Sequence, residues 1–466
     1  MTPELITFTH QIAMSLHRVG LAGAGVDRTV YTRLGEEWTR ESAHLHDRLT
    51  KDALRQGMTQ FVATNDNHVR EMVYKRLGYP VIVRTGKSKV PSVDKGTLQR
   101  LVTEHSPNAF IIDFIAFNAV DKLLSMWVGK EGRKATRKTV GDLIQAVPGK
   151  DNVGLLHFWI FPLRARTGRR ASGGGEEGDP EGRNAQNWHP KARQMIVSRW
   201  AGGKLAVADF SKLEMVVMGW RAKDSKLLDY FLNGKGYIGI AEEFWGQKVE
   251  PDSKLYKAIK CIVLGLNYNM KAWKLANDLW YKVDFKFSDD WGTHLKKTIR
   301  ARKKYLNLFK GLKRYIRERI SEVEETQQVV SPSGRVRHLP HHGRDSEGFW
   351  HVENAAVNQP IQSFAADITG CAIVDYEAAM LKEHKLSYLD WHQVLLEHPW
   401  DLPCSPVFNE VHDELDLDLH PKTGKHDLEI LVDCMQNVRT LKKMVPGFDI
   451  TLKCDVQLVS NWGEAK

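Results

Sequence analysis

The sequence VFNEVHDELDLDLH, residues 407–420, alternates apolar and polar side chains with a period of two on both sides of an acidic group at 412–414. This period is typical of β-strands, so the stretch predicts two strands joined by a tight turn. Buried charge is costly unless it is paired or binds a metal, and we therefore expect a counter-charge at the turn. Asp416 and Asp418 alternate with leucines and are predicted to mark the solvent face of the second strand.

Composition narrows the class of protein. The chain has 466 residues, of which 42% are hydrophobic and 27% charged, as in ordinary globular proteins. Its net charge of +10 fits a polyanionic partner, although a merely basic enzyme has the same charge. The five cysteines are widely spaced and form no CxxC pair, which favours reduced thiols over a disulfide framework or a zinc site. The sequence contains neither a signal-peptide pattern nor an apolar run of membrane-spanning length.

Helical patterns dominate the chain and strands are few. Helices are expected through most of 1–150 and 211–325, and again at 355–381. A buried strand is predicted at 204–210 (KLAVADF) and a hairpin at 327–340. Strands that are separated by long helical insertions and include an antiparallel hairpin indicate an α+β fold, not a doubly wound parallel sheet.

Two acidic residues are associated with predicted strands. Asp209 ends the strand at 204–210, and Asp413 lies in the turn of 407–420. If the fold brings them together, they can hold two Mg²⁺ ions about 3.5–4 Å apart for in-line phosphoryl or nucleotidyl transfer. Taken singly, Asp413 is explained better by a polar turn and Asp209 by a helix N-cap than by a metal site. The hypothesis therefore needs independent support.

The segment YKAIKCIVLGLNYNM, residues 256–270, supplies that support. On a helix, Lys260, Leu264 and Tyr268 fall on one face. A helix face with a basic residue first, an apolar residue in the middle and an aromatic residue last can bind the triphosphate, the sugar and the base of a nucleotide in that order. An amphipathic core helix with a solvated lysine is the alternative interpretation.

Together these segments resemble the family A DNA polymerases, the group of bacterial DNA polymerase I and related phage replicases. DFSKLE (209–214), KAIKCIVLGLNYNM (257–270) and VHDE (411–414) are similar to the first motif, the fingers helix and the third motif of that family. RARTGRRAS (164–172), NAQNWHP (184–190), SGRVRHLP (333–340) and NQPIQSFAAD (358–367) resemble further family segments in the same order. The N-terminal third resembles the family's thumb, so the similarity spans nearly the whole chain.

The resemblance implies a right-hand polymerase with a helical thumb, an antiparallel-sheet palm and helical fingers. Residues 1–155 would form the thumb and the lead-in to the palm, 156–225 the first part of the palm, 226–344 the fingers and 345–466 the second part of the palm. The implied activity is DNA-templated addition of dNTPs to a primer 3′ end in replication or repair, in the cytoplasm of a bacterium or a phage-infected cell. Because the chain begins at the thumb, no proofreading 3′–5′ exonuclease is expected, and a separate exonuclease or processivity factor is a candidate partner.

The resemblance also implies roles for single residues. The metal ligands would be Asp209 and Asp413, holding two Mg²⁺ ions with Mn²⁺ as a substitute, and Lys260 would join them in catalysis. Glu214 would be a steric gate that clashes with a ribose 2′-OH, with a helix-start Glu as the plain alternative. The implied nucleotide-binding residues are Glu214, Tyr237, Lys257, Lys260, Leu264 and Tyr268. The implied DNA-binding residues are Arg169, Asn358, Gln362, His412 and Glu414, and the basic run 296–318 is either a phosphate-backbone surface or a solvated face.

Four positions depart from the family pattern. Tyr256 replaces the Arg of the fingers helix, so phosphate contact would pass to Lys257 or Lys254. The others are Leu264 for an aromatic residue, Asn269 for a Gly and Val216 for an Arg. None removes a metal ligand, so we expect activity, with changed fidelity or rate. The alternatives are a related polymerase with other substrates, a catalytically inactive DNA-binding or scaffold protein, and an unrelated Mg²⁺-dependent nuclease.

Overall fold

The computed structural model describes residues 2–85, 88–128, 139–157, 159–162, 164–173, 184–340 and 352–465 of the chain. It has two compact units. Unit 1 comprises Met1–Gly25, Leu155–Trp188 and Ile196–Lys466, and unit 2 comprises Val26–Gly154 and His189–Met195. No helix in these described ranges combines the length and apolarity that crossing a membrane requires.

Unit 2 is mainly helical. Its helices are α2 (Arg28–Arg55), α3 (Asp66–Arg70), η1 (Glu71–Arg76), α4 (Lys95–Glu104), α5 (Ala109–Trp127), α6 (Val140–Leu143) and α7 (Pro190–Arg193), with strand β2 (Gln145–Val147). β1 (Ala24–Asp27) and β3 (Lys150–Leu156) lie where the chain passes from one unit to the other. Asp27 caps the N-terminus of α2, because its carboxylate accepts a hydrogen bond from the Val30 backbone N–H at 3.0 Å. Arg48 of α2 pairs with the buried Asp113 of α5 at 2.7 Å, so the two long helices are joined by charge as well as by packing.

Unit 1 holds the remaining elements. Before its main sheet come α1 (Pro3–Ala22), β4 (Ile160–Phe161), β5 (Ala171–Ser172), η2 (Ala185–Asn187) and β6 (Ile196–Val197). The helical middle contains α8 (Leu213–Arg221), α9 (Ser225–Leu232), α10 (Tyr237–Trp245), α11 (Lys254–Asn267), α12 (Ala272–Asn277), η3 (Asp278–Lys282), α13 (Trp291–Leu308) and α14 (Lys310–Thr326). The main sheet consists of β7 (Leu205–Phe210), β10 (Val407–Val411), β11 (Glu414–Asp418) and β12 (Cys454–Val459). The other elements are β8 (Gln328–Val330), β9 (Val336–His338), α15 (Glu353–Glu383), α16 (Tyr388–Glu397), α17 (Gly424–Asn437), α18 (Arg439–Met444) and η4 (Trp462–Glu464).

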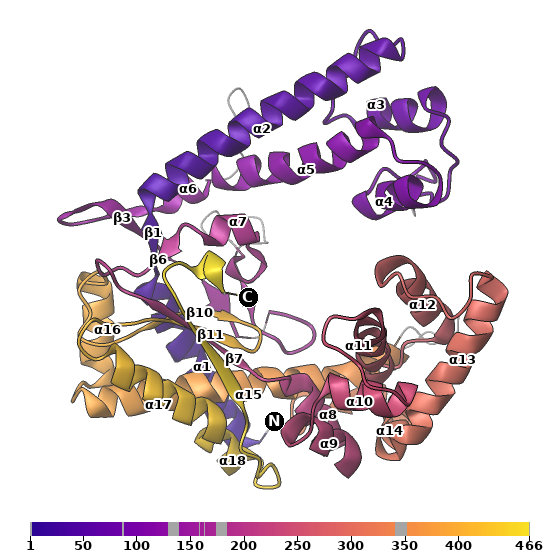
Figure 1. Ribbon diagram of the computed structural model, residues 1–466. Helices are drawn as coiled ribbons and strands as arrows, with labels where there is room; N and C mark the ends of the chain where they lie inside the picture. Colours follow the sequence, from indigo (N-terminus) through magenta and orange to yellow (C-terminus); the bar gives the residue numbers. More distant parts are fainter. Residues whose placement is uncertain are drawn as a thin grey trace. The chain divides into compact units, whose positions relative to one another are not determined.

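The main sheet has the strand order β10-β11-β7-β12, and every neighbouring pair is antiparallel (Figure 1). The predicted strand at 204–210, the strand pair of 407–420 and the hairpin at 327–340 are therefore confirmed. One face of the sheet joins the main hydrophobic core, through Ala206, Ala208, Phe210, Leu415 and Leu417.

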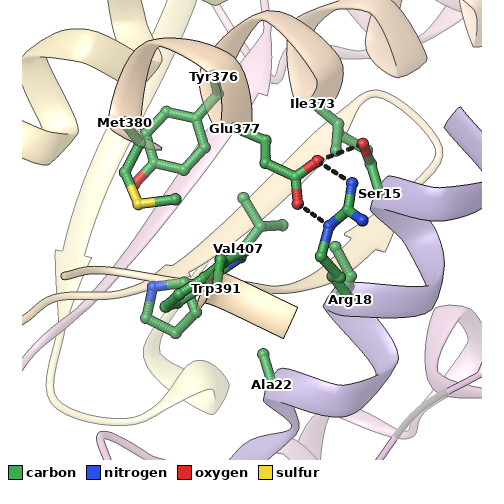
Figure 2. A pocket seen from close by; sticks show the side chains of 11 residues that line it. Ser15, Arg18, Ala22, Ile373, Tyr376, Glu377, Met380, Trp391 and Val407 are labelled. Atoms are coloured by element: carbon green, nitrogen blue, oxygen red, sulfur yellow. Dashed lines mark hydrogen bonds and ion pairs between the residues drawn. The ribbon is translucent and has the colours of Figure 1, made fainter. Parts of the chain in front are cut away.

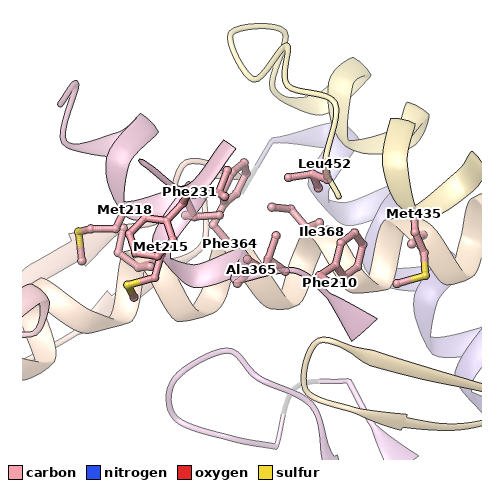
Figure 3. Close-up of a cluster of buried hydrophobic side chains, with 14 of the residues drawn as sticks. Phe210, Met215, Met218, Phe231, Phe364, Ala365, Ile368, Met435 and Leu452 are labelled. Atoms are coloured by element: carbon pink, nitrogen blue, oxygen red, sulfur yellow. The ribbon is translucent and has the colours of Figure 1, made fainter. Parts of the chain in front are cut away.

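Helix α15 is the centre of that core. It has 31 residues and is buried on nearly all sides, as expected for a helix whose apolar residues are not confined to one stripe. Figure 3 shows Phe364, Ala365 and Ile368 of α15 packed toward Phe210 at the end of β7. The end of β7 that carries Asp209 therefore packs against α15, the longest of the described helices of unit 1.

A buried ion pair ties α1 to α15. Arg18 donates to Glu377 through Nη2 at 2.8 Å, and the Ser15 hydroxyl donates to the same carboxylate at 2.6 Å (Figure 2). The adjoining cavity has a volume of about 20 Å³, which is room for about one water molecule. This cavity is a packing void beside an internal ion pair and is too small for an organic ligand.

The prediction for Asp416 and Asp418 is wrong, because both side chains are fully buried. The alternation itself is correct, and the two aspartates share the sheet face opposite the leucines. That face is covered by protein instead of water. Arg199, also fully buried, donates to Asp418 at 2.8 Å, and the Asn409 amide donates to Asp416 at 3.1 Å. These hydrogen bonds and the ion pair offset the free-energy cost of burying the two carboxylates.

Candidate active site

The register of the main sheet brings the two predicted metal ligands together. Glu414, the first residue of β11, is paired with Asp209 on β7. The Phe210 backbone N–H donates to the Asp413 carbonyl at 3.1 Å, so the turn residue lies beside the end of β7. Opposed residues of antiparallel strands have Cα atoms about 4.5–5.5 Å apart. Residues far apart in the chain therefore form one group of carboxylates.

Electrostatics identify this group as a site of concentrated negative charge. Burial and then the nearby charges of Asp413 and Glu414 raise the pKa of Asp209 to about 7. Burial is also the main cause that raises the pKa of Asp413, and Glu214 contributes to the rise. Lys212, which precedes α8, opposes both shifts. Arg169 also opposes the shift of Asp413. Burial and the neighbouring carboxylates nevertheless disfavour the charged form of both aspartates, and a bound cation would stabilise it.

Glu214 is held by two partners. It lies in the first turn of α8, where a carboxylate is also favoured by the helix dipole. Arg169 forms an ion pair with one of its oxygens, and the Tyr268 hydroxyl donates to the other. Burial, followed by the charge of Glu214, raises the pKa of Tyr268 well above its ordinary value, so the phenol stays protonated as a donor. The side chain predicted as a steric gate is thus fixed from two directions.

The predicted triphosphate-binding lysines lie on the exposed side of α11. Lys257 and Lys260 are both exposed, and the Lys260 ammonium lies 6.0 Å from the centre of the Tyr237 ring. Tyr237 is buried at the start of α10 and meets Tyr256 edge to face at 6.4 Å. Leu264 is 38% exposed on the same helix. The structure therefore groups these four predicted nucleotide-binding residues around one helix face and one aromatic ring.

The structure explains one of the four departures and shows which lysine is available beside a second. α11 ends at Asn267, and Tyr268 caps it, because Asn269 adopts the left-handed region at φ +59°. Asn tolerates that region better than most side chains, which is how it can replace a Gly there. Lys254 is paired with Asp284 at 2.7 Å. Lys257, which is exposed and forms no ion pair within the described part of the chain, is therefore the available cation nearest to Tyr256 in the sequence.

The predicted DNA-binding residues come from three elements. Arg169 precedes β5 and contacts Glu214, as described above. His412 adopts φ +65° in the turn before Asp413, and burial followed by the charge of Arg169 lowers its pKa. Asn358 and Gln362 are one turn apart on α15 and partly exposed, although most of that helix is buried. Glu414 and His412 join the carboxylate group, whereas Asn358 and Gln362 lie on a separate helix.

Several supporting residues could not be identified from the sequence pattern. Asp455 on β12 is paired with Asp209 from the side opposite Glu414, and its charge adds to the rise of the Asp209 pKa. Buried Arg170 pairs with Glu410 of β10 and donates to the Ala366 carbonyl at 2.7 Å. Asp455 lies in the segment FDITLKCDVQLV (448–459), which has the composition of strands, but nothing in that segment indicates that it pairs with Asp209. The Arg170 partners lie far away in the chain, and nothing local reveals them.

The donor set fits magnesium. In the part of the chain that the structure describes, no group of three or more His, Cys, Asp or Glu side chains is arranged to hold a metal. Mg²⁺ commonly binds through one or two carboxylates and takes its other ligands from water and substrate phosphates. Asp209 and Asp413 meet that requirement, because they offer carboxylate oxygens and because the charge of Asp413 disfavours ionisation of Asp209 when no cation is bound.

Comparisons with known proteins agree on one family. The family model described as DNA polymerase family A matches residues 29–464. DNA polymerase I of Bacillus subtilis (strain 168) is 25% identical over 466 residues, covering 98% of this chain and 45% of its own length. DNA polymerase I of Pseudomonas aeruginosa is 25% identical over 455 residues, covering 97% of this chain and 43% of its own length. The chain thus spans less than half the length of these relatives.

A solved structure has the same fold. The POL domain of Pol1 from M. smegmatis, in complex with DNA primer-template and dNTP, aligns with a TM-score of 0.75 at 20% identity. The alignment covers 98% of this chain and 70% of that one. The predicted fold class, α+β of the right-hand polymerase type, is confirmed.

Proposed function

Because the chain belongs to DNA polymerase family A, we propose that it is a DNA-directed DNA polymerase that adds dNTPs to the 3′ end of a primer. In this reaction the primer 3′-oxygen forms a bond to the α-phosphorus of the dNTP. The bond between the α-phosphorus and its bridging oxygen breaks, pyrophosphate leaves, and the 3′-hydroxyl proton is released. The partners are primer–template DNA and dNTPs.

One observation carries the proposal. Asp209 and Asp413 come from distant parts of the chain, meet at the ends of adjacent strands, and have raised pKa values for the reasons given above. In this proposal they hold two Mg²⁺ ions. When bound, the ions lower the pKa of the primer hydroxyl and neutralise charge on the leaving pyrophosphate. Two partly buried carboxylates side by side are costly for the fold alone, and a metal role accounts for their presence.

The residues around the carboxylates orient the nucleotide. Lys260, exposed on α11, pairs with the triphosphate as a point charge, and Lys257 supports it. Tyr237 supplies the ring beside Lys260, and Leu264 faces the sugar in place of an aromatic residue. Glu214, held by Arg169 and Tyr268, occupies the space of a ribose 2′-OH and so selects deoxynucleotides.

The remaining predicted residues contact the primer–template. Arg169, Asn358 and Gln362 offer hydrogen bonds that test base-pair geometry in the minor groove, where the pattern barely depends on sequence. His412 and Glu414 support the primer end beside Asp413. In this scheme residues 1–155 act as thumb and lead-in, 156–225 and 345–466 as palm, and 226–344 as fingers.

Primer extension tests the proposal. We expect Asp413→Asn to lower the extension rate in Mg²⁺ by at least about 100-fold, while affinity for duplex DNA changes only a few-fold. Asp449→Asn, which changes a carboxylate that is 91% exposed, serves as the matched control and should extend normally. Extension by Asp413→Asn at close to the wild-type rate would exclude the metal assignment. The expected lack of 3′–5′ exonuclease activity stays a prediction, and shortening of a labelled mispaired primer without nucleotides would contradict it.

A further inference from the structure

The last residue of α11 carries a buried side-chain amide, one position before Tyr268. Asn267 is fully buried, and its Oδ1 accepts a hydrogen bond from the Tyr305 hydroxyl of α13 at 2.8 Å. Its Nδ2 donates to the sulfur of Met215 on α8 at 3.1 Å. We name Asn267, Tyr305 and Met215 the amide clamp. Three helices that are separate in the chain thus meet at one side chain.

The amide clamp is adjacent in the chain to the predicted gate on two of these helices. Met215 follows Glu214, and Asn267 precedes Tyr268. Because the Tyr268 hydroxyl donates to Glu214, two links join the end of α11 to the start of α8. The link through Met215 is the more deeply buried one, and Met215 is among the core side chains labelled in Figure 3.

Tyr305 is itself held firmly. Its ring is fully buried and lies 4.9 Å from the ring of Phe309, which is also fully buried. Burial raises the pKa of the Tyr305 hydroxyl well above its ordinary value, so the hydroxyl keeps its proton and can donate. The donor comes from α13 and not from α8 or α11. The position of the Asn267 amide is therefore set by a third element.

Packing alone does not require an amide at this position. A leucine of similar size would fill the same volume without removing an amide and a hydroxyl from water. Neutral buried hydrogen bonds add little net stability, because both groups bond to water in the unfolded chain. A fully paired buried network instead adds direction and rigidity. The amide clamp therefore fixes where the end of α11 lies relative to α8.

We propose that Asn267 is a positioning residue for sugar selection, which keeps Tyr268 on the Glu214 carboxylate. This inference rests on the proposed polymerase function, in which Glu214 occupies the space of a ribose 2′-OH. Asn267 is fully buried and touches no substrate, so it acts through its neighbours. Without the amide clamp the end of α11 can shift, the bond from Tyr268 to Glu214 loosens, and the carboxylate can turn away from the sugar. Ribonucleoside triphosphates are the ligands that then gain access.

Single-nucleotide primer extension with Mg²⁺ tests the inference by comparing kcat/KM for dCTP with that for CTP opposite a templating guanine. Tyr305→Phe keeps the ring and removes the hydroxyl. It should lower the dCTP-to-CTP ratio by about threefold to tenfold, the size of one neutral hydrogen bond, mainly through faster use of CTP. Tyr376→Phe is the matched control, because it removes another buried hydroxyl, which donates to the Ser405 carbonyl at 2.7 Å. It should leave the ratio unchanged.

A compensated double variant separates positioning from stability. Tyr305→Phe combined with Asn267→Leu leaves neither the hydroxyl nor the amide buried without its partner. Its melting temperature should therefore return close to the wild-type value, while the dCTP-to-CTP ratio stays low. If the ratio recovers together with the melting temperature, the amide clamp serves stability alone and the inference is overturned.

A combination with the gate variant tests the route of the effect. Adding Tyr305→Phe to Glu214→Ala should lower the ratio no further, because the side chain through which the amide clamp acts is already gone. Two effects that multiply would overturn the inference. So would a wild-type ratio in Tyr305→Phe when the wild type extends primers. If the wild-type chain extends no primer with dNTPs, the proposed function itself fails and the inference falls with it.

Discussion

Replacing Asp209 by Asn should stabilise the metal-free protein while it removes a proposed metal ligand. The pKa of Asp209 rises from its ordinary value of 3.8 to about 7, so the charged form is disfavoured in the folded state. A pKa difference of one corresponds to about 1.36 kcal/mol, which gives about 4 kcal/mol for this rise. Because Asp209 is only partly buried, solvent screening reduces the effect to about 2 kcal/mol. Asn has nearly the same shape and carries no charge, so it avoids this cost.

The raised pKa of Asp209 also determines how the stability of the wild-type protein changes with pH. Between pH 3.8 and about 7 the folded state holds a proton on Asp209 that the unfolded state has lost, so wild-type stability falls as pH rises through this range. Above about pH 7 the loss is complete. Asp209→Asn does not titrate, and its advantage should therefore be about 1 kcal/mol at pH 5.5 and about 2 kcal/mol at pH 8.

Thermal melts with EDTA at the two pH values measure this effect. At pH 8 the advantage corresponds to a rise in Tm of about 3 °C for a chain of this size. Added Mg²⁺ should stabilise the wild type and narrow the gap, because an ion that binds only the folded state adds to its stability. Asp449→Asn is the control for general loss of a carboxylate. A Tm for Asp209→Asn that is equal to or below the wild type at pH 8, or a gap independent of pH, would refute the reasoning.

Three further predictions concern other parts of unit 1. Glu214→Ala should lower the preference for dNTPs over rNTPs by about tenfold or more in competitive primer extension, because it removes the side chain proposed to exclude the 2′-OH; unchanged preference would exclude a gate. Glu377→Ala should lower the free energy of unfolding by about 3–5 kcal/mol in denaturant titrations, since it leaves Arg18 buried without its partner, and Arg18→Met with Glu377→Leu should restore most of it. Asn269→Val should be less stable than Asn269→Gly by at least about 1–2 kcal/mol, because both variants lose the hydrogen bond from the Asn269 amide to Glu353 and only valine is strained at the positive φ; equal melting of the two would show that the backbone strain is absent.

Local periodicity was sufficient to predict the elements that carry the site. The strand at 204–210 and the strand pair of 407–420 follow from alternation and turn residues, and α15 follows from a long helical pattern. The positions of Asp209 at a strand end and Asp413 in a turn were therefore predictable. Their meeting was only a hypothesis from the sequence, because strand order and register depend on the whole sheet.

The errors and omissions come from tertiary contacts. A period-two pattern states which residues share a face, but it does not state what covers that face. Asp418 was assigned to solvent because its partner, Arg199, is remote in the chain, and no spacing rule connects the two. Asp455 was missed for the same reason, since its importance depends on its pairing with Asp209 in the folded sheet.

The two adjacent arginines after Gly168 explain how the site is held in place. Arg169 is partly exposed and pairs with Glu214 at the start of α8, whereas its neighbour Arg170 is buried and pairs with Glu410 of β10. One short segment thereby connects the helix that carries the predicted gate to the strand that leads into the Asp413 turn. Buried ion pairs contribute little net stability, because desolvation offsets their attraction. Their directional hydrogen bonds nevertheless fix where each partner lies, so the Arg170 pair is better understood as setting the position of the carboxylate group than as stabilising the fold.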